Sequence, residues 1–252
     1  MLVHIATPAN RLAYAHYLPQ MFSQRREVFV DWLGWKDMNV VDGMEIDDID
    51  AVPEIEYILT IDELGKLVGS SRFVPCTGPH LLSGALKNFV QRPYERSPHV
   101  WEWTRYAPTT TREGPNVKAA RAFMLTAVQE WAVRRGVTHL LGISDDSNIA
   151  FATRMGWRNR PLGMPIESEG RPTTAIEFTT SEEALQNTRD FWQLEQPVTY
   201  EAPPPAAKAP ISIEEIGILD AVFGLAEHER GGVLHALSRL DENEQPLIRV
   251  VG

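Results

Sequence analysis

The chain has 252 residues, of which 43% are hydrophobic and 23% charged, and its formal net charge is −10. This length suits one full core of about 200 residues plus an appendage, and the acidic balance argues against general nucleic-acid binding. The single cysteine, Cys76, excludes an internal disulfide and a cysteine zinc cluster. No apolar run approaches the roughly 20 residues of a membrane span, and the start lacks the pattern of a secretory signal, so we expect a cytoplasmic protein.

The first predicted element is helical. Apolar residues recur with helical spacing from Ala9 to Trp35, and Pro19 should kink or divide this stretch. Arg25 falls in line with Phe22 and Phe29, at the edge of the apolar stripe. From spacing alone, two alternatives stay open: an arginine that extends to solvent and one with a functional partner.

An acidic loop follows the helical stretch. It does not have the spacing of a calcium-binding loop, which needs alternating oxygen ligands and a glutamate at its twelfth position. Taken alone, it is best interpreted as a solvated loop. Its carboxylates are Asp42, Glu45, Asp47, Asp48, Asp50 and Glu54.

A β-hairpin is predicted next, with strands at 55–61 and 66–74. Arg72 shares a face of the second strand with Val68 and Val74. It is therefore a charged side chain within an apolar strand face.

The stretch VWEWTRYA, residues 100–107, has the aromatic and β-branched composition of another strand. Glu102 and Arg105 interrupt it, and burying such charges is costly unless they are paired. Because side chains alternate along a strand, a separation of three places them on opposite faces if the strand is regular.

The remaining elements alternate in type. Helices are predicted at 118–134, 148–155 and 181–192, and strands at 137–144 and 173–180. This order indicates an α/β fold of three layers with a mostly antiparallel sheet.

Three segments are expected along the chain. Residues 1–200 form the main domain, 201–210 a proline-rich linker, and 211–252 a short helical extension. About 40 residues are too few to form a stable fold alone, so we expect the extension to mediate self-association or a contact with the main domain or a partner.

Several kinds of site are not signalled by the sequence. It contains neither the glycine motifs of dinucleotide and P-loop sites nor the motifs of serine hydrolases and zinc proteases. The seven histidines do not show ligand spacing, so no metal site is predicted.

Eight residues, in order along the chain, carry a resemblance to a known family. No single one is specific, but the set is: Arg25, Phe29, Trp35, Asp47, Asp50, Arg72, Glu102 and Arg105. Over roughly residues 10–195 the chain resembles the acyl-homoserine-lactone synthases, the bacterial autoinducer synthases.

The resemblance implies a fold like that of N-acetyltransferases. It also implies a reaction in which an acyl group passes from acyl carrier protein or acyl-CoA to the amine of S-adenosylmethionine. Lactonisation then expels methylthioadenosine and yields a quorum-sensing signal. S-adenosylmethionine and the acyl thioester are substrates, and neither a metal nor a permanently bound cofactor is implied.

The resemblance assigns Glu102 and Arg105 to catalysis, with Glu102 as the general base. Burial among Trp101 and Trp103 would raise the pKa of Glu102 and Arg105 would lower it, and the sequence does not decide between these effects. A β-bulge between Glu102 and Arg105 would bring both to one face. The alternative is a regular strand with separate ion pairs.

Six residues are expected to bind S-adenosylmethionine or to form an electrostatic cluster near it. The two aspartates of this set would either hold the substrate amine or order their loop through Arg25, Arg72 and Arg105. The second role is favoured for at least one of the aspartates. The six are Arg25, Phe29, Trp35, Asp47, Asp50 and Arg72.

Two further sets of residues follow from the expected arrangement. The acyl pocket is predicted to be lined by Phe123, Met124, Leu141, Ser144, Met155 and Trp157. Docking of the carrier protein or CoA is predicted at Lys118, Arg121, Arg154 and Arg158. Two other functions stay open: another acyl-CoA-dependent N-acyltransferase of the same fold, and a non-enzymatic sensor of acyl ligands.

Overall fold

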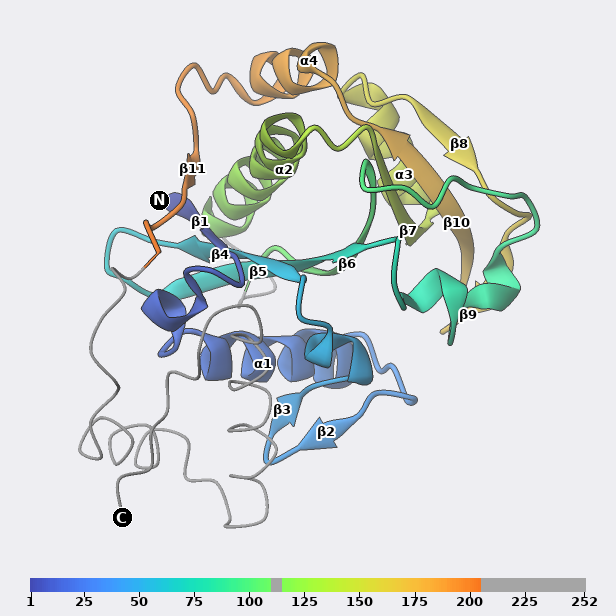
Figure 1. Cartoon of the computed structure of the whole chain (residues 1–252), viewed down its shortest axis with the longest axis horizontal. Helices are drawn as coiled ribbons and strands as arrows, with labels where there is room; N and C mark the ends of the chain where they lie inside the picture. Colours follow the sequence, from blue (N-terminus) through green and yellow to red (C-terminus); the bar gives the residue numbers. More distant parts are fainter. Residues whose placement is uncertain (110–114, 205–252) are drawn as a thin grey trace, which may run out of the picture.

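The computed structural model describes residues 1–109 and 115–204. In this part of the chain one twisted sheet has α2, α3 and α4 on one face and α1 on the other (Figure 1). The predicted three-layer α/β architecture with a mostly antiparallel sheet is therefore confirmed.

The main sheet has the strand order β11-β1-β4-β5-β6-β7-β10-β8, with β9 paired to β10. Among the described strands, β1 pairs with β11 and β6 with β7 in parallel, and the other neighbours are antiparallel. A separate small hairpin is formed by β2 and β3. The strands are β1 (Leu2–Ala6), β2 (Val40–Val41), β3 (Met44–Glu45), β4 (Glu56–Ile61), β5 (Leu67–Pro75), β6 (Val100–Ala107), β7 (His139–Asp145), β8 (Asn159–Pro161), β9 (Ile166–Ser168), β10 (Arg171–Thr179) and β11 (Thr199–Tyr200).

Helices connect most of these strands. Pro19 lies in the first turn of α1, where its missing N–H costs nothing, and it separates α1 from a preceding short helix, as expected. The helices are η1 (Arg11–Tyr14), α1 (Leu18–Arg25), the π-helical η2 (Arg26–Trp32), η3 (Asp48–Ala51), η4 (Leu81–Ser83), η5 (Lys87–Phe89), α2 (Pro115–Arg135), α3 (Asp146–Arg154) and α4 (Glu182–Trp192).

The strand β1 is not among the elements predicted from sequence. Its apolar residues Val3 and Ile5 are fully buried in the core beneath α2, and its backbone pairs with β4 along its whole length. A five-residue run is too short for its periodicity to separate a strand from the beginning of a helix.

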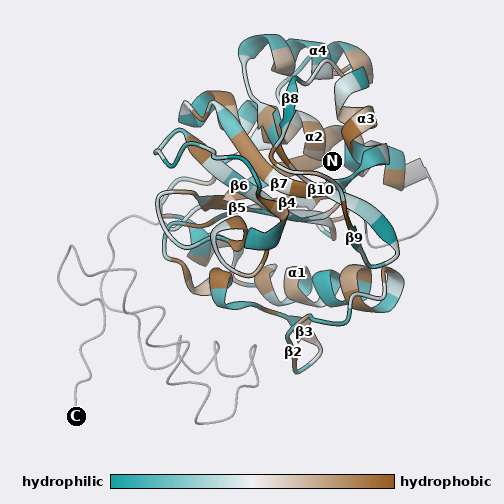
Figure 2. Ribbon diagram, turned by 90° about the vertical axis from the view of Figure 1, so that its right-hand side faces the viewer, coloured by the Kyte–Doolittle hydropathy of each residue, from teal (hydrophilic) through white to brown (hydrophobic). Residues whose placement is uncertain are grey.

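The two faces of the sheet carry different side chains. The α2 face is apolar and aromatic: Phe73 stacks on Trp131 with 3.8 Å between ring centroids, and Trp101 and Trp103 pack into the same core. Figure 2 shows hydrophobic residues, in brown, on the central strands of the sheet between α1 and α2. Glu102, which alternates with these tryptophans, points to the opposite face. The charged residues singled out in the sequence therefore lie on the α1 face.

The predicted bulge in β6 is present, but it lies slightly later in the strand. Arg72 pairs with Thr104 and Ser70 with Ala107, so β6 has one extra residue between these pairs. Arg105 lies inside the bulge with a φ of +53°, a left-handed conformation that side chains rarely adopt. This turn brings Arg105 to the same face as Arg72.

Two further expectations from sequence concern membrane spans and the C-terminal segments. No helix within the two described ranges is long and apolar enough to cross a membrane. The extension at 211–252, and all of the expected linker except residues 201–204, lie outside the described residues.

Candidate active site

Three arginines and three carboxylates form a closed ring of ion pairs on the α1 face. Each arginine binds two of the carboxylates, and each carboxylate binds two of the arginines, so formal charge balances within the ring. The ring consists of Arg25, Glu45, Arg105, Asp47, Arg72 and Asp50, in order of contact.

The pairs around the ring are short. Arg25 Nε lies 2.5 Å from Glu45 Oε2, and the other two nitrogens of Arg25 donate to both oxygens of Asp50 at 2.8 and 2.9 Å. Arg72 contacts Asp50 at 2.8 Å and Asp47 at 2.5 and 3.0 Å. Such fork-shaped contacts fix orientation as well as charge.

Arg105 closes the ring. Its Nη2 donates to Asp47 Oδ2 at 2.6 Å and to Glu45 Oε1 at 3.0 Å. Asp47 and Asp50 thus both pair with the arginines, which is the arrangement that the loop-ordering role, favoured for at least one of them, requires. Nothing in the sequence separates Glu45 from the other five carboxylates of this loop, so its place in the ring is not predicted from sequence.

Local structure prepares the loop for these contacts. Asp47 caps the short helix η3, accepting from the backbone N–H of Ile49 and Asp50, while Asp50 Oδ2 accepts from the N–H of Asp47. Tyr57 donates to Asp50 Oδ1 at 2.9 Å. These bonds hold both aspartates before any ligand arrives.

Burial and charge oppose each other at the ring. Burial on its own would raise the pKa of Asp50, but the charges of Arg25 and Arg72 outweigh it and hold this pKa below its usual value. In the same way, burial alone would lower the pKa of Arg72, and Asp50 and Asp47 raise it. Both groups therefore stay charged throughout the neutral range.

Two members of the ring reach solvent more than the others. The side chain of Asp47 is 17% exposed and that of Arg105 is 11% exposed, whereas the other four are 4% exposed or less. Arg25 is therefore not an arginine that extends to solvent. A ligand approaching the ring meets Asp47 and Arg105 first.

Phe29 and Trp35 form an aromatic wall beside the ring. Their rings stack with 4.9 Å between centroids, and the guanidinium of Arg105 lies 5.9 Å from the centre of Phe29. The structure thus brings the two expected aromatic residues to the arginine cluster, where they offer π-faces to a cation or a heterocycle.

Glu102 lies on the same face as Arg72, fully buried beneath η4. Its two oxygens accept from the backbone N–H groups of Leu81 and Leu82 at 2.8 and 2.7 Å. Burial raises the pKa of Glu102 above its usual value, although the Leu82 and Leu81 N–H groups and the charges of Arg72 and Arg105 act against it. Contrary to the expectation from sequence, its burial does not come from Trp101 and Trp103, because both point to the other face.

The predicted acyl-pocket residues do not all lie together. Met124, Met155 and Trp157 are buried in the core under α2, and Phe123 packs against it. Leu141 instead belongs to a separate cluster on the opposite face, with Cys76 and Leu82 among its members. The prediction that Leu141 lines a pocket together with the residues under α2 is therefore wrong. Ser144 lies three residues further along β7 and is partly exposed.

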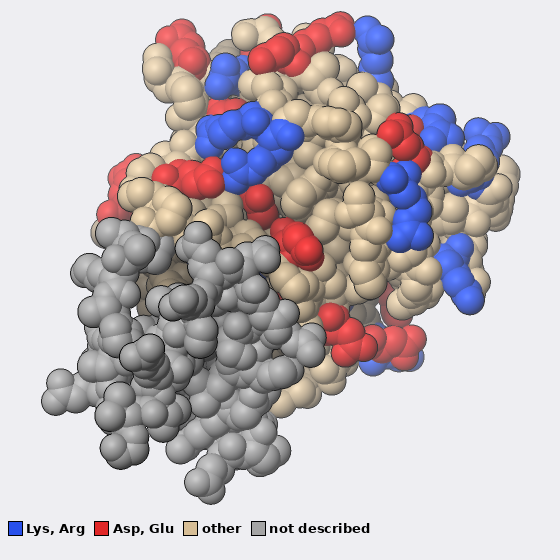
Figure 3. All heavy atoms as spheres, viewed as in Figure 1, with Lys and Arg blue, Asp and Glu red and all other residues tan. Residues whose placement is uncertain are grey.

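The predicted docking cations have different surroundings. Lys118 and Arg154 are exposed, whereas Arg121 is partly buried with its guanidinium 4.1 Å from the ring centre of Phe151. Arg158 is exposed and ion-paired with Glu183 at 3.1 Å. On the face shown in Figure 3, positive and negative side chains are interspersed.

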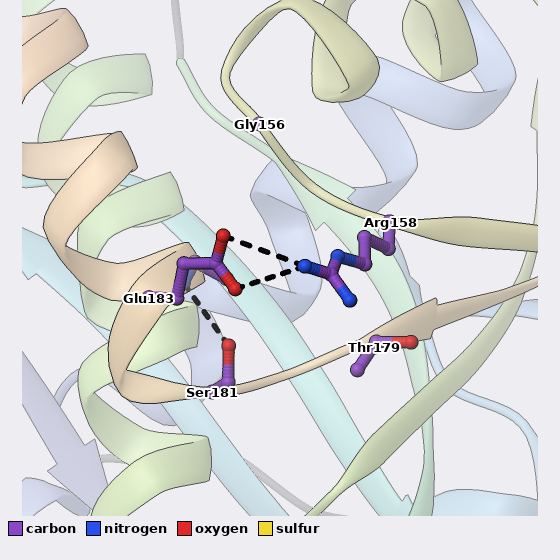
Figure 4. A pocket seen from close by; sticks show the side chains of 6 residues that line it. Gly156, Arg158, Thr179, Ser181 and Glu183 are labelled. Carbon is purple, nitrogen blue, oxygen red and sulfur yellow. Dashed lines mark hydrogen bonds and ion pairs between the residues drawn. The ribbon is translucent and has the colours of Figure 1, made fainter.

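One small pocket lies away from the ring. Figure 4 shows it between the turn after α3, the end of β10 and the start of α4, where Arg158 reaches across to Glu183. It shares no residue with the ring or with the predicted acyl pocket. Its lining residues are Gly156, Arg158, Thr179, Ser181, Glu183 and Ala184.

Comparison with known proteins gives consistent matches. A family model described as autoinducer synthase matches residues 9–188. An acyl-homoserine-lactone synthase of Rhizobium etli is 33% identical over 147 residues, covering 57% of this chain and 68% of the relative. An isovaleryl-homoserine lactone synthase of Bradyrhizobium diazoefficiens is 27% identical over 190 residues, covering 75% of this chain and 84% of the relative.

A similar fold is found among solved structures. One is a CoA-dependent acyl-homoserine lactone synthase with SAM and isopentyl-CoA. It superposes with a TM-score of 0.73 at 25% identity, covering 81% of this chain and 94% of that chain.

Proposed function

The chain belongs to the autoinducer synthase family, and we propose that it makes an acyl-homoserine lactone from S-adenosylmethionine and an acyl thioester. The structural observation that carries this proposal is the closed ring of three arginines and three carboxylates beside a buried glutamate. We assign the activity to the domain at residues 1–200.

S-adenosylmethionine is proposed to bind at the exposed side of the ring. Arg105 would bind its carboxylate and Asp47 its amine, since these are the two ring members that solvent reaches. Phe29 and Trp35 would face the sulfonium or the adenine. Arg25, Arg72, Glu45 and Asp50 are proposed to hold these groups in place rather than to touch the substrate.

Glu102 is proposed as the general base, acting through one water because its own oxygens are buried and already accept two N–H groups. Loss of a proton lets the substrate nitrogen attack the thioester carbon, whose C–S bond breaks to release a thiol. The substrate carboxylate then attacks the carbon bonded to the sulfonium, which closes the lactone and releases methylthioadenosine.

The acyl donor is proposed to enter where β6 and β7 separate. Their pairing ends at Glu102 and Leu141, after which the two strands no longer bond to each other. Both acyl carrier protein and acyl-CoA present the thioester on the same pantetheine arm, and Lys118 and Arg154 are the proposed docking cations. No permanently bound cofactor is proposed, and the reaction is placed in the cytoplasm, where the free thiol of Cys76 stays reduced.

The proposal is tested by mass spectrometry of a reaction with the purified full chain, S-adenosylmethionine, and a panel of acyl-CoA and acyl-carrier thioesters. We expect a lactone together with methylthioadenosine, both lost in Glu102→Ala. The matched control is Glu95→Gln, an exposed glutamate after η5, which should keep full activity. An acyl amide without lactone would instead indicate another N-acyltransferase, and a folded protein that neither reacts nor binds S-adenosylmethionine would contradict the proposal.

A further inference from the structure

Among the buried polar atoms that make no hydrogen bond of acceptable geometry within the described part of the chain, two are neighbours on the α2 face. They are Oη of Tyr106, on β6, and Nε of Arg121, on α2. An unpaired buried polar atom costs free energy comparable to a lost hydrogen bond, so such atoms need an explanation. Neither atom is used by the ion-pair ring, which lies on the other face of the sheet.

The two side chains are neighbours and both are held in place. Burial raises the pKa of Tyr106, so its phenol stays protonated. The charge of Arg121 and a close polar contact between the two side chains act against that shift. Arg121 Nη2 donates to Asn148 Oδ1 at 3.1 Å, and its guanidinium stacks on Phe151. The ring of Tyr106 packs edge-on against Trp103 with 5.2 Å between centroids.

Each atom carries a hydrogen that it can donate, the O–H of Tyr106 and the Nε–H of Arg121, and the two lie beside the opening between β6 and β7. Tyr106 follows the last paired residue of β6, Glu102, by four positions. Asn148, which holds Arg121, lies in the first turn of α3, just after β7 ends at Asp145. Two donors without an acceptor fit an incoming oxygen atom better than an incoming N–H or cation.

The bulge accounts for this placement. Because Arg105 has a left-handed conformation, it points to the ring, while the next residue, Tyr106, packs into the core on the α2 face. Adjacent residues of one strand therefore face the two proposed substrates from opposite sides of the sheet.

We propose that Tyr106 Oη and Arg121 Nε form a two-donor site for a carbonyl oxygen of the pantetheine arm of the acyl donor. The site rests on the proposed function, in which a thioester enters between β6 and β7. An amide carbonyl is neutral and accepts two hydrogen bonds, so it satisfies both donors without bringing a second charge into a partly buried place. Arg121 is thus assigned to the arm and not to the surface of the carrier.

The test compares the wild type with Tyr106→Phe, which removes one oxygen and keeps the ring. We expect KM to rise about three- to tenfold for an acyl-CoA and for the matching acyl-pantetheine thioester, because the variant loses one hydrogen bond to the donor. KM should not change for S-adenosylmethionine or for an acyl ethyl thioester, which lacks the arm. Because acyl-pantetheine carries no phosphate, a loss confined to acyl-CoA would overturn the proposal in favour of a phosphate site.

Two variants serve as comparisons. Arg121→Lys keeps the charge but removes Nε, and combined with Tyr106→Phe it should give less than the sum of the two single effects, because both bind one atom. Tyr17→Phe removes a phenol that donates to Gly65 O at the surface, and it should leave every KM unchanged.

A binding measurement separates this site from the proposed function. Calorimetry with S-ethyl pantetheine, an unreactive thioether, should give a Kd that is about three- to tenfold weaker in Tyr106→Phe, even if the wild type makes no lactone from any donor. Equal Kd values would overturn the proposal, and would mean that a trapped water joins the two atoms instead.

Discussion

Arg72 and Arg105, on neighbouring strands, bind the two oxygens of one carboxylate, that of Asp47, at 2.5 and 2.6 Å. Their positions in β5 and β6 would place them on opposite faces if β6 were regular, and the bulge at Arg105 removes that mismatch. The ring of ion pairs therefore depends on one backbone irregularity as much as on six side chains.

Asp50→Asn should destabilise the protein by about 3–5 kcal/mol near pH 7, because Arg25 and Arg72 lose a shared buried partner. The pKa of Asp50 is lowered in the folded state, so its contribution is present above the unfolded value of about 3.9 and is lost as pH falls towards the lower folded value. The free energy of unfolding measured with denaturant should therefore differ from that of the wild type by the full amount near pH 7, and the difference should shrink below about pH 4.

The control for this experiment is Asp48→Asn, in the same loop but exposed. It should change the free energy of unfolding by no more than about 0.5 kcal/mol. A loss of similar size in both variants would show that the loop, and not the buried pairing, is responsible.

Much of the fold and most of the ring could be predicted from sequence. Hairpin strands and helix ends carry local signals, such as Ser181, which accepts the N–H of Ala184 at the start of α4 as its type and position indicate. The ring residues carry a signal of another kind, since charges within apolar patterns need partners.

The remaining features depend on tertiary contacts. Glu45 has no local pattern that separates it from its acidic neighbours, and its burial follows from the approach of Arg25 and Arg105. The wrong assignment of Leu141 to the α2 face has a related cause. Leu140 and Leu141 are both fully buried, on opposite faces of β7, so this strand shows no alternation from which a face could be assigned.

Glu102→Gln should separate stability from activity. The pKa of Glu102 is raised in the folded state, so the stability linked to its protonated form is present below the ordinary value of 4.5 and is lost as pH rises through the folded value. The difference in free energy of unfolding, variant minus wild type, should therefore increase as pH rises from about 4 to 7. Lactone formation should be lost at every pH in this range. A difference that does not vary with pH would mean that Glu102 titrates normally.

Glu130→Gln should loosen β11 from the edge of the sheet. The carboxylate of Glu130, on α2, accepts the backbone N–H groups of Val198 and Thr199 and the hydroxyl of Thr199, and it also pairs with Arg189 at 2.9 Å. Losing these charge-assisted bonds should cost about 2–3 kcal/mol. Hydrogen exchange at Val198 and Thr199 should become faster in the variant than in Glu183→Gln, which alters only an exposed pair, and equal rates in the two variants would contradict this role.

Gly142→Ala tests how tightly β6 and β7 are held where they begin to separate. A Cβ at Gly142 would lie 2.9 Å from the carbonyl oxygen of Trp103, so the two strands must move apart at the proposed entrance for the acyl donor. We expect a loss of about 1–3 kcal/mol in the free energy of unfolding and a higher KM for the thioester. Gly78→Ala is the control, because nothing lies within 4 Å of its Cβ. If both variants kept the wild-type KM for the thioester, the donor would not pass between these strands.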